Sequence, residues 1–375
     1  MKIKMIAKPL AAISAAAVLI SASGCADTSW SFKNSAKELS NGVWIYKTYT
    51  VMNEAVSKYQ EESGKTIQVT DDDFADKKVE KKKIFDWITD KAKDECVEIL
   101  TIEKLVKDNK VKIDKESVES NQKMYENYMT QYGMDKLYEK LGVATKTAAY
   151  ADTTIATYKD DLFKALYDKN GSKAVSDEEV KKYFTENYTD YYYINYSFKT
   201  TDSEGNSVDI DDATKDKVTA AFAKYAKELN EGKKVTKEID EEYKTDFELG
   251  EDGNVPSISN VANMADSNIN EDVQKEIKAL GDKKATVKLI DDTYYLLYKG
   301  SISEKAEKIT DDTSVEDAIS RIDIVHKMKD DEFDKYIEAE KKKLKYDTNN
   351  DCLSKYTVER TVNLYKEFVN SNSEN

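Results

Sequence analysis

Histidine and proline are almost missing from this chain of 375 residues. His326 is the single histidine, and Pro9 and Pro256 are the two prolines. One histidine excludes zinc sites that need several, and any nucleophile activated by histidine would depend on His326 alone. Because the apolar residues Ile322 and Val325 lie just before His326, we interpret it as part of a packed helix rather than as a ligand.

Cysteine is also scarce, and positive charge is in deficit. Cys96 and Cys352 lie outside any Cys-x-x-Cys motif, so they are either two separate thiols or one disulfide of an exported protein. The 58 Lys and Arg against 73 Asp and Glu give a net charge of −15. This balance argues against nucleic acid as a partner, since phosphate binding needs a basic surface.

Long hydrophobic runs are lacking beyond the N-terminal segment, so we expect no other part of the chain to span a membrane. Lys2, Lys4 and Lys8 form a positively charged segment that precedes an apolar run over residues 10–20. That run is shorter than the roughly 20 residues of a membrane helix, and it fits a secretory signal peptide, which we place at 1–24. Loss of its three lysines would change the net charge to −15 − 3 = −18.

Small residues lead from the apolar run to Cys25. The segment Ala22-Ser23-Gly24-Cys25 resembles a bacterial lipobox, although Ala22 stands where that motif usually has leucine. The resemblance implies that Cys25 carries a lipid and tethers the protein to the extracytoplasmic face of the cell membrane. The alternative is ordinary cleavage near Ala22 and a freely secreted protein.

Apolar residues spaced by three and four predict helices over much of the remaining chain. The predicted segments are 46–60, 84–106, 114–132, 134–141, 145–166 and, near the C-terminus, 307–345, whose stripe includes Val315. Each apolar stripe is narrow, and the opposite side of the same helix carries charged residues. This pattern is typical of helices that pack on one another.

The middle of the chain has a different pattern. Ile194, Tyr196 and Phe198 alternate with other residues in an aromatic run, which predicts a strand over 191–199. Further elements give an α+β module: helices at 176–187, 218–232 and 273–280, a turn-rich segment at 246–268, and strands at 285–290 and 294–298.

Oxygen-bearing residues at calcium-loop spacing occur once before this module. Asp168, Asn170, Ser172 and Glu179 match four loop positions, but Lys173 stands where the loop needs glycine. We therefore interpret the segment as a solvated linker, and the sequence predicts neither a metal site nor a cofactor.

The order of these elements resembles the extracytoplasmic foldases of the PrsA/SurA type. The likeness rests on segments 111–118, 175–184, 279–287, 292–297 and 330–345, each degenerate alone but in the expected order. The resemblance implies an α+β fold in which a discontinuous helical chaperone domain, similar to the SurA N-terminal domain, carries an inserted parvulin-like module. It implies domains at 25–175 and 306–375 for the helical part and at 176–305 for the module.

The resemblance fails at the residues that carry activity in parvulins. Asn195 and Tyr295 occupy the two strand positions where parvulins usually have histidine, so no catalytic residue is assigned and the module is expected to be impaired as a prolyl isomerase. Tyrosine offers apolar area at low entropic cost, and five aromatic residues are candidates for substrate binding: Tyr193, Tyr196, Phe198, Tyr294 and Tyr298.

The function expected from this resemblance is that of a membrane-anchored chaperone that binds unfolded, exported polypeptides. One alternative is an active peptidyl-prolyl cis-trans isomerase with an unusual site. A second is a cell-surface lipoprotein for ligand binding or adhesion, whose mark would be a deep, specific pocket.

Overall fold

The computed structural model describes residues 29–250, 253–309 and 319–373. The signal peptide expected at 1–24, the expected lipid attachment at Cys25 and the stripe residue Val315 lie outside the described residues. The chain divides into two compact units, which we call the helical unit (Met1–Ala165 with Glu332–Asn375) and the sheet unit (Leu166–Asp331). Both divisions fall inside helices, whereas the sequence analysis placed them at 175/176 and 305/306.

The helical unit follows the apolar spacing of the sequence closely. Asp114 begins one helix by accepting the backbone N–H groups of Glu116 and Ser117, each at 3.1 Å. Gly133 and Gly142 bound another with φ of 69° and 79°, a left-handed conformation that favours glycine. Its helices are α1 (Asn41–Ser63), α2 (Ile84–Asp108), α3 (Lys115–Gln131), α4 (Met134–Leu141), α5 (Thr145–Ala149), the π-helix η3 (Tyr150–Thr154), α6 (Ile155–Tyr167), α13 (Asn350–Lys355) and α14 (Val358–Ser373).

A small sheet joins the two ends of the helical unit. Its strands are β11 (Asp347–Thr348), β1 (Trp30–Lys33) and β2 (Glu38–Ser40), in that order. Phe32 lies opposite Thr348, and the side chain of Asn349 donates to the carbonyl oxygen of Trp30 at 2.9 Å. No strand was predicted here from the sequence, because segments of two to four residues are too short to show an alternating pattern.

The C-terminal segment also packs on the N-terminal helices. In the part of α12 (Arg321–Lys343) that belongs to the helical unit, Phe333 meets Phe163 of α6 edge to face, with ring centroids 5.3 Å apart. Further along, the indole N–H of Trp44 donates to the carbonyl oxygen of Tyr356 at 2.7 Å. Trp44, Phe163 and Phe333 are all buried, so residues from both ends of the sequence build one core.

The sheet unit is centred on four antiparallel strands in the order β8-β5-β10-β9. They are β8 (Ser257–Ala262), β5 (Thr189–Ser197), β10 (Thr293–Lys299) and β9 (Lys284–Ile290). Strand β8 lies within the segment that the sequence predicted as turns, because its serine and asparagine residues are poor strand formers. Helix α9 (Thr236–Asp246) was also missed; only Ile239 and Tyr243 of it are buried, too few to form a visible stripe.

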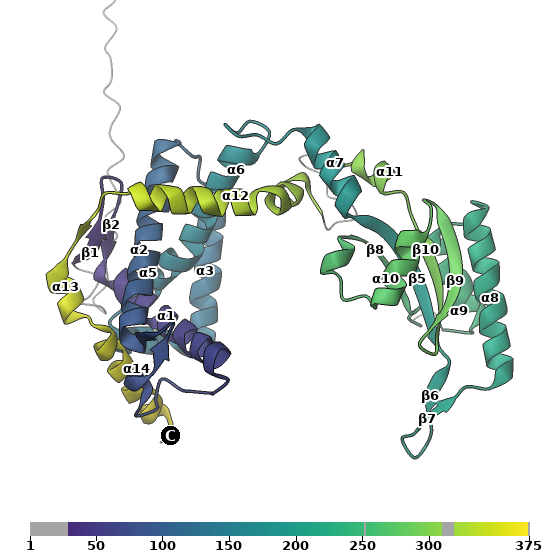
Figure 1. Ribbon diagram of the computed structural model, residues 1–375, viewed down its shortest axis with the longest axis horizontal. Coiled ribbons are helices and arrows are strands. Elements are labelled where there is room, and N and C mark those ends of the chain that lie inside the picture. Colours follow the sequence, from purple (N-terminus) through teal and green to yellow (C-terminus); the bar gives the residue numbers. More distant parts are fainter. Residues whose placement is uncertain (1–28, 251–252, 310–318, 374–375) are drawn as a thin grey trace, which may run out of the picture. The chain divides into compact units, whose positions relative to one another are not determined.

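Two helical layers cover the two faces of this sheet. Figure 1 shows α8 (Asp212–Asn230) and α10 (Glu271–Ala279) on opposite sides of it. Helices α8 and α9 pack on one face through Phe222, Tyr225 and Tyr243, and α10 packs on the other through Val273 and Ile277. The shorter elements are β3 (Lys78–Val79), β4 (Lys82–Lys83), β6 (Lys199–Thr201), β7 (Ser207–Asp209), α7 (Asp177–Asn187), α11 (Ile302–Ala306) and the 3₁₀ turns η2 (Phe74–Asp76) and η4 (Met264–Asp266).

Arg321, at the start of α12, holds the beginning of the sheet unit in place. Its side chain is buried, with 1% of the residue exposed. It donates to Asp168 Oδ1 at 2.5 Å, to Asp177 Oδ1 at 2.9 Å and to the carbonyl oxygen of Val175 at 2.5 Å. One guanidinium therefore fixes the segment that precedes α7, and its hydrogen bonds hold the pKa of Asp177 below its ordinary value.

We expect Arg321→Leu to destabilise the protein by about 1–3 kcal/mol, because it leaves a buried carbonyl and two carboxylates without their donor. The lowered pKa of Asp177 adds stability above its ordinary pKa of about 3.9, and this stability is lost as the pH falls through the folded-state value. Chemical denaturation at pH 7 and below pH 4 should therefore show a smaller difference between wild type and variant in acid. Equal differences at both values would contradict this role; Lys169→Met, which removes a surface partner of Asp177 and leaves Arg321 in place, is the control.

Candidate functional site

The two positions matched to the parvulin histidines are direct partners across the sheet. Asn195 of β5 lies opposite Tyr295 of β10 in the antiparallel register. Because side chains alternate along a strand, both point to the α10 face together with Tyr193. Asn195 and Tyr295 are half-buried. The two residues singled out by the family resemblance therefore lie side by side in the fold.

Three tyrosines form a continuous row on this face, and we call Tyr191, Tyr193 and Tyr295 the tyrosine row. The rings of Tyr191 and Tyr193 are stacked with centroids 6.3 Å apart, and Tyr193 meets Tyr295 in a T-shaped contact at 6.0 Å. Leu297 of β10 and Met264 are buried against the same cluster. Tyr191 and Tyr193 are buried, with 3% and 8% of their surfaces exposed, and Tyr295 is half-buried, so the row forms an aromatic layer of the core on this face of the sheet.

An open cavity of about 450 Å³ adjoins the tyrosine row. Exposed Ile258 of β8 lies opposite Tyr193 in the register, and 44% of its surface is accessible. Strand β8, and with it Ile258, was not predicted from the sequence; the signal that could have identified the strand is its lack of charge in a chain with 35% charged residues. The residues that line the cavity from β5, β8 and the preceding turn include Tyr188, Tyr191, Tyr193, Ile258 and Asn260.

The polar groups around the cavity are engaged in local interactions. Burial raises the pKa values of Tyr191 and Tyr193, so both phenols are neutral at physiological pH. Lys327 pairs with Asp266 at 3.4 Å, and Ser267 donates to the carbonyl oxygen of Met264 at 2.9 Å. Among the lining residues that the structure describes, no hydroxyl or thiol is bonded to a general base, so the arrangement suits binding rather than covalent chemistry.

The other four aromatic candidates lie on the opposite face of the sheet. Tyr196, Phe198, Tyr294 and Tyr298 all pack against the core formed with α8 and α9. Tyr294 stacks between Phe198 at 5.5 Å and Phe222 at 5.7 Å. Of the five candidates for substrate binding, the structure therefore brings only Tyr193 together with Asn195 and Tyr295, and the others contribute to the core.

The remaining sequence candidates have structural partners. Asp168 is bonded to Arg321, and Glu179 accepts the backbone N–H of Ser176 at 2.9 Å in a capping box, so these calcium-loop oxygens serve the fold. His326 Nδ1 lies 2.8 Å from Asp330 Oδ1. Within the described ranges, no cluster of His, Cys, Asp and Glu has the arrangement of a metal site.

Cys96 and Cys352 are separate thiols in the structure, and both are buried. Burial raises the pKa of Cys352 to about 11 and that of Cys96 further. Neither thiol is therefore present as the reactive thiolate at physiological pH.

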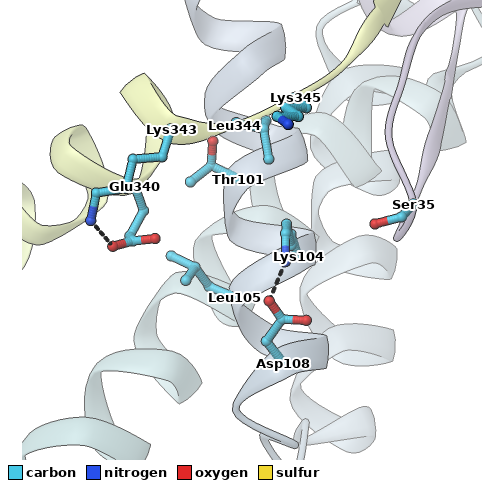
Figure 2. Close-up of a pocket in the computed structure, with 9 residues that line it drawn as sticks. All are labelled: Ser35, Thr101, Lys104, Leu105, Asp108, Glu340, Lys343, Leu344 and Lys345. Atoms are coloured by element: carbon cyan, nitrogen blue, oxygen red, sulfur yellow. Dashed lines mark hydrogen bonds and ion pairs between the residues drawn. The ribbon is translucent and has the colours of Figure 1, made fainter.

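A second cavity, of about 390 Å³, lies in the helical unit. Figure 2 shows that its lining comes from α2, from the end of α12 with Leu344 and Lys345, and from Ser35 between β1 and β2. Two of its lysines pair with acids of the same lining, Lys104 with Asp108 and Lys343 with Glu340. Four of the lining side chains are therefore engaged in ion pairs, whereas the cavity beside the tyrosine row is bordered by exposed, apolar Ile258.

Comparisons with protein-family profiles and with curated protein sequences find no match. Among solved structures, PrsA from Bacillus subtilis is similar to this chain with 15% sequence identity and a TM-score of 0.27, over 74% of this chain and 93% of that one. A likeness of this size leaves the function to be argued from the site. No helix in the described ranges is both long enough and apolar enough to cross a membrane.

Proposed function

We propose that this protein is a membrane-anchored, extracytoplasmic chaperone that binds unfolded polypeptides on the α10 face of its sheet unit. The observation that carries the proposal is exposed Ile258 at an open cavity whose wall includes Tyr191 and Tyr193 of the tyrosine row. Aromatic and aliphatic surface of this kind binds apolar side chains without demanding one sequence. A shallow cavity that is open to solvent also suits an extended chain better than a small ligand that must be enclosed.

The matched pair Ile258 and Leu289 tests the location of this binding face. Both are exposed aliphatic residues of the same sheet, with 44% and 58% of their surfaces accessible. Ile258 lies beside the tyrosine row, whereas Leu289 lies opposite Tyr294 and hence points to the α8 and α9 face. The same substitution at each position therefore replaces an exposed aliphatic side chain by a charge, but on opposite faces of the sheet.

We expect Ile258→Asp to weaken binding of an unfolded client about tenfold, because a contact worth about 1.4 kcal/mol is replaced by a charge. Leu289→Asp should bind as the wild type does. The measurement is suppression of aggregation of thermally denatured citrate synthase, titrated with the mature chain from residue 26. Equal loss in both variants, or loss only in Leu289→Asp, would refute the proposed face.

Prolyl isomerisation is the second candidate function, favoured by the direct pairing of Asn195 with Tyr295. Uncatalysed isomerisation takes tens to hundreds of seconds, so modest catalysis is measurable. With neither histidine present, we expect the mature chain at micromolar concentration to accelerate an X-Pro peptide less than about tenfold. A larger rate that is lost in Tyr295→Phe or Asn195→Ala would instead establish the isomerase.

The membrane anchor is proposed from the sequence motif that ends in Cys25. We expect Cys25→Ser, made in the full-length chain, to release the protein from the membrane fraction or to block its maturation. Mass spectrometry of the wild-type N-terminus should find diacylglycerol on Cys25. An unmodified N-terminus beyond Cys25 would exclude lipidation and leave secretion as the localisation.

A further inference from the structure

Strand β8 forms one edge of the four-stranded sheet. Strand β5 pairs with its inner side, and among the described strands none pairs with its outer side. An edge strand presents backbone N–H and C=O groups that can pair with another extended chain. Because Ile258 and Asn260 of β8 also line the cavity, this edge strand borders the face that we propose to bind polypeptides.

The register identifies which backbone groups point outwards. The N–H of Asn195 donates to the carbonyl oxygen of Pro256 at 3.2 Å, and bonded pairs alternate along an antiparallel ladder. Ile258 and Asn260 therefore bond to β5, and Ser257, Ser259 and Val261 direct their backbone groups to the outer edge. In agreement with this assignment, the N–H of Val261 donates to the side chain of Asn260 at 2.8 Å rather than to β5.

The composition of β8 lacks the features that usually protect an edge. Charged side chains, proline and bulges discourage pairing at the edges of natural sheets. Strand β8 reads Ser-Ile-Ser-Asn-Val-Ala, without charge or proline, although 35% of the chain is charged. The opposite edge, β9, carries Lys284 and Lys288. The two edges of one sheet thus differ in the way expected if only one of them accepts a partner.

We infer that an extended segment of the bound polypeptide adds to the outer side of β8 as a further strand of the sheet. This inference rests on the proposed function and specifies how the polypeptide is held. Main-chain hydrogen bonds to Ser257 and Ser259 supply affinity that does not depend on the client's sequence. Alternate side chains of the added strand, about 4.8 Å from β8, fall beside exposed Ile258, which favours apolar residues there.

Ser259 allows a test that leaves the sheet itself intact. Ser259→Pro removes an N–H that points outwards, and proline is tolerated in edge strands at such positions. Ser259→Ala keeps the N–H and is the matched control. The probe is a fluorescein-labelled peptide of alternating tyrosine and threonine with a lysine at each end, measured by anisotropy with the mature chain. We expect Ser259→Pro to weaken binding about three- to tenfold and Ser259→Ala to leave it unchanged.

The same peptide with N-methyl groups on two neighbouring central residues provides a second measurement that does not depend on the variant's folding. The methylated peptide lacks one N–H donor on each of its two edges, so it should bind the wild-type protein about three- to tenfold more weakly than the unmethylated peptide does.

Three outcomes would contradict the inference. If Ser259→Pro and the methylated peptide both leave the affinity unchanged while Ile258→Asp reduces it, the proposed binding face is retained and strand addition is wrong. If the wild type neither binds the peptide nor suppresses aggregation, both proposals fail. If Ser259→Pro instead converts a dimer to a monomer in sedimentation, the edge pairs with a second copy and the inference is overturned.

Discussion

The antiparallel pairing of β5 with β10 is the constraint on which the proposed site depends. Side chains alternate along each strand, so one register sorts a dense run of aromatic residues onto two faces with different roles. Tyr191, Tyr193 and Tyr295 go to the α10 face, and Tyr196 and Tyr294 go to the α8 and α9 face. A slip of one residue would exchange these sets and remove both the row and the core behind it.

The tyrosines of the α8 and α9 face show how a core can be built from polar aromatic residues. Tyr192 and Tyr225 are buried, yet their hydroxyl groups donate to Asp240 and Asp246, each at 2.8 Å. Burial is the main reason why the pKa values of both phenols are raised, and the neighbouring carboxylates raise them further. Each ring therefore fills the interior while its hydroxyl meets a partner near the surface. This core supports the strands from behind, so that the opposite face can remain partly exposed.

The sequence predicted the parts of the fold that carry a strong local signal. The stripe of α2, the capping residue Asp114 and the two strands separated by Asp291 and Asp292 all correspond to observed elements. Strand β8 was not predicted, because its position is set by pairing with β5 rather than by its own composition. The family resemblance singled out Asn195 and Tyr295 separately, whereas their pairing and the place of Ile258 required the three-dimensional register. Local patterns identify elements, and long-range pairing determines which side chains meet.

The sheet that joins the two ends of the helical unit has a consequence for how the chain reaches its folded state. Asn349 bonds to Trp30 across a separation of 319 residues, and closing so long a loop is entropically costly and slow. A chain that emerges from its N-terminus onwards leaves exposed those surfaces of α1 and α2 that α14 covers until its last segment arrives. The sheet unit has no such delay, because its strands lie within one continuous stretch of sequence. During its own synthesis the protein therefore resembles the unfolded chains that it is proposed to bind.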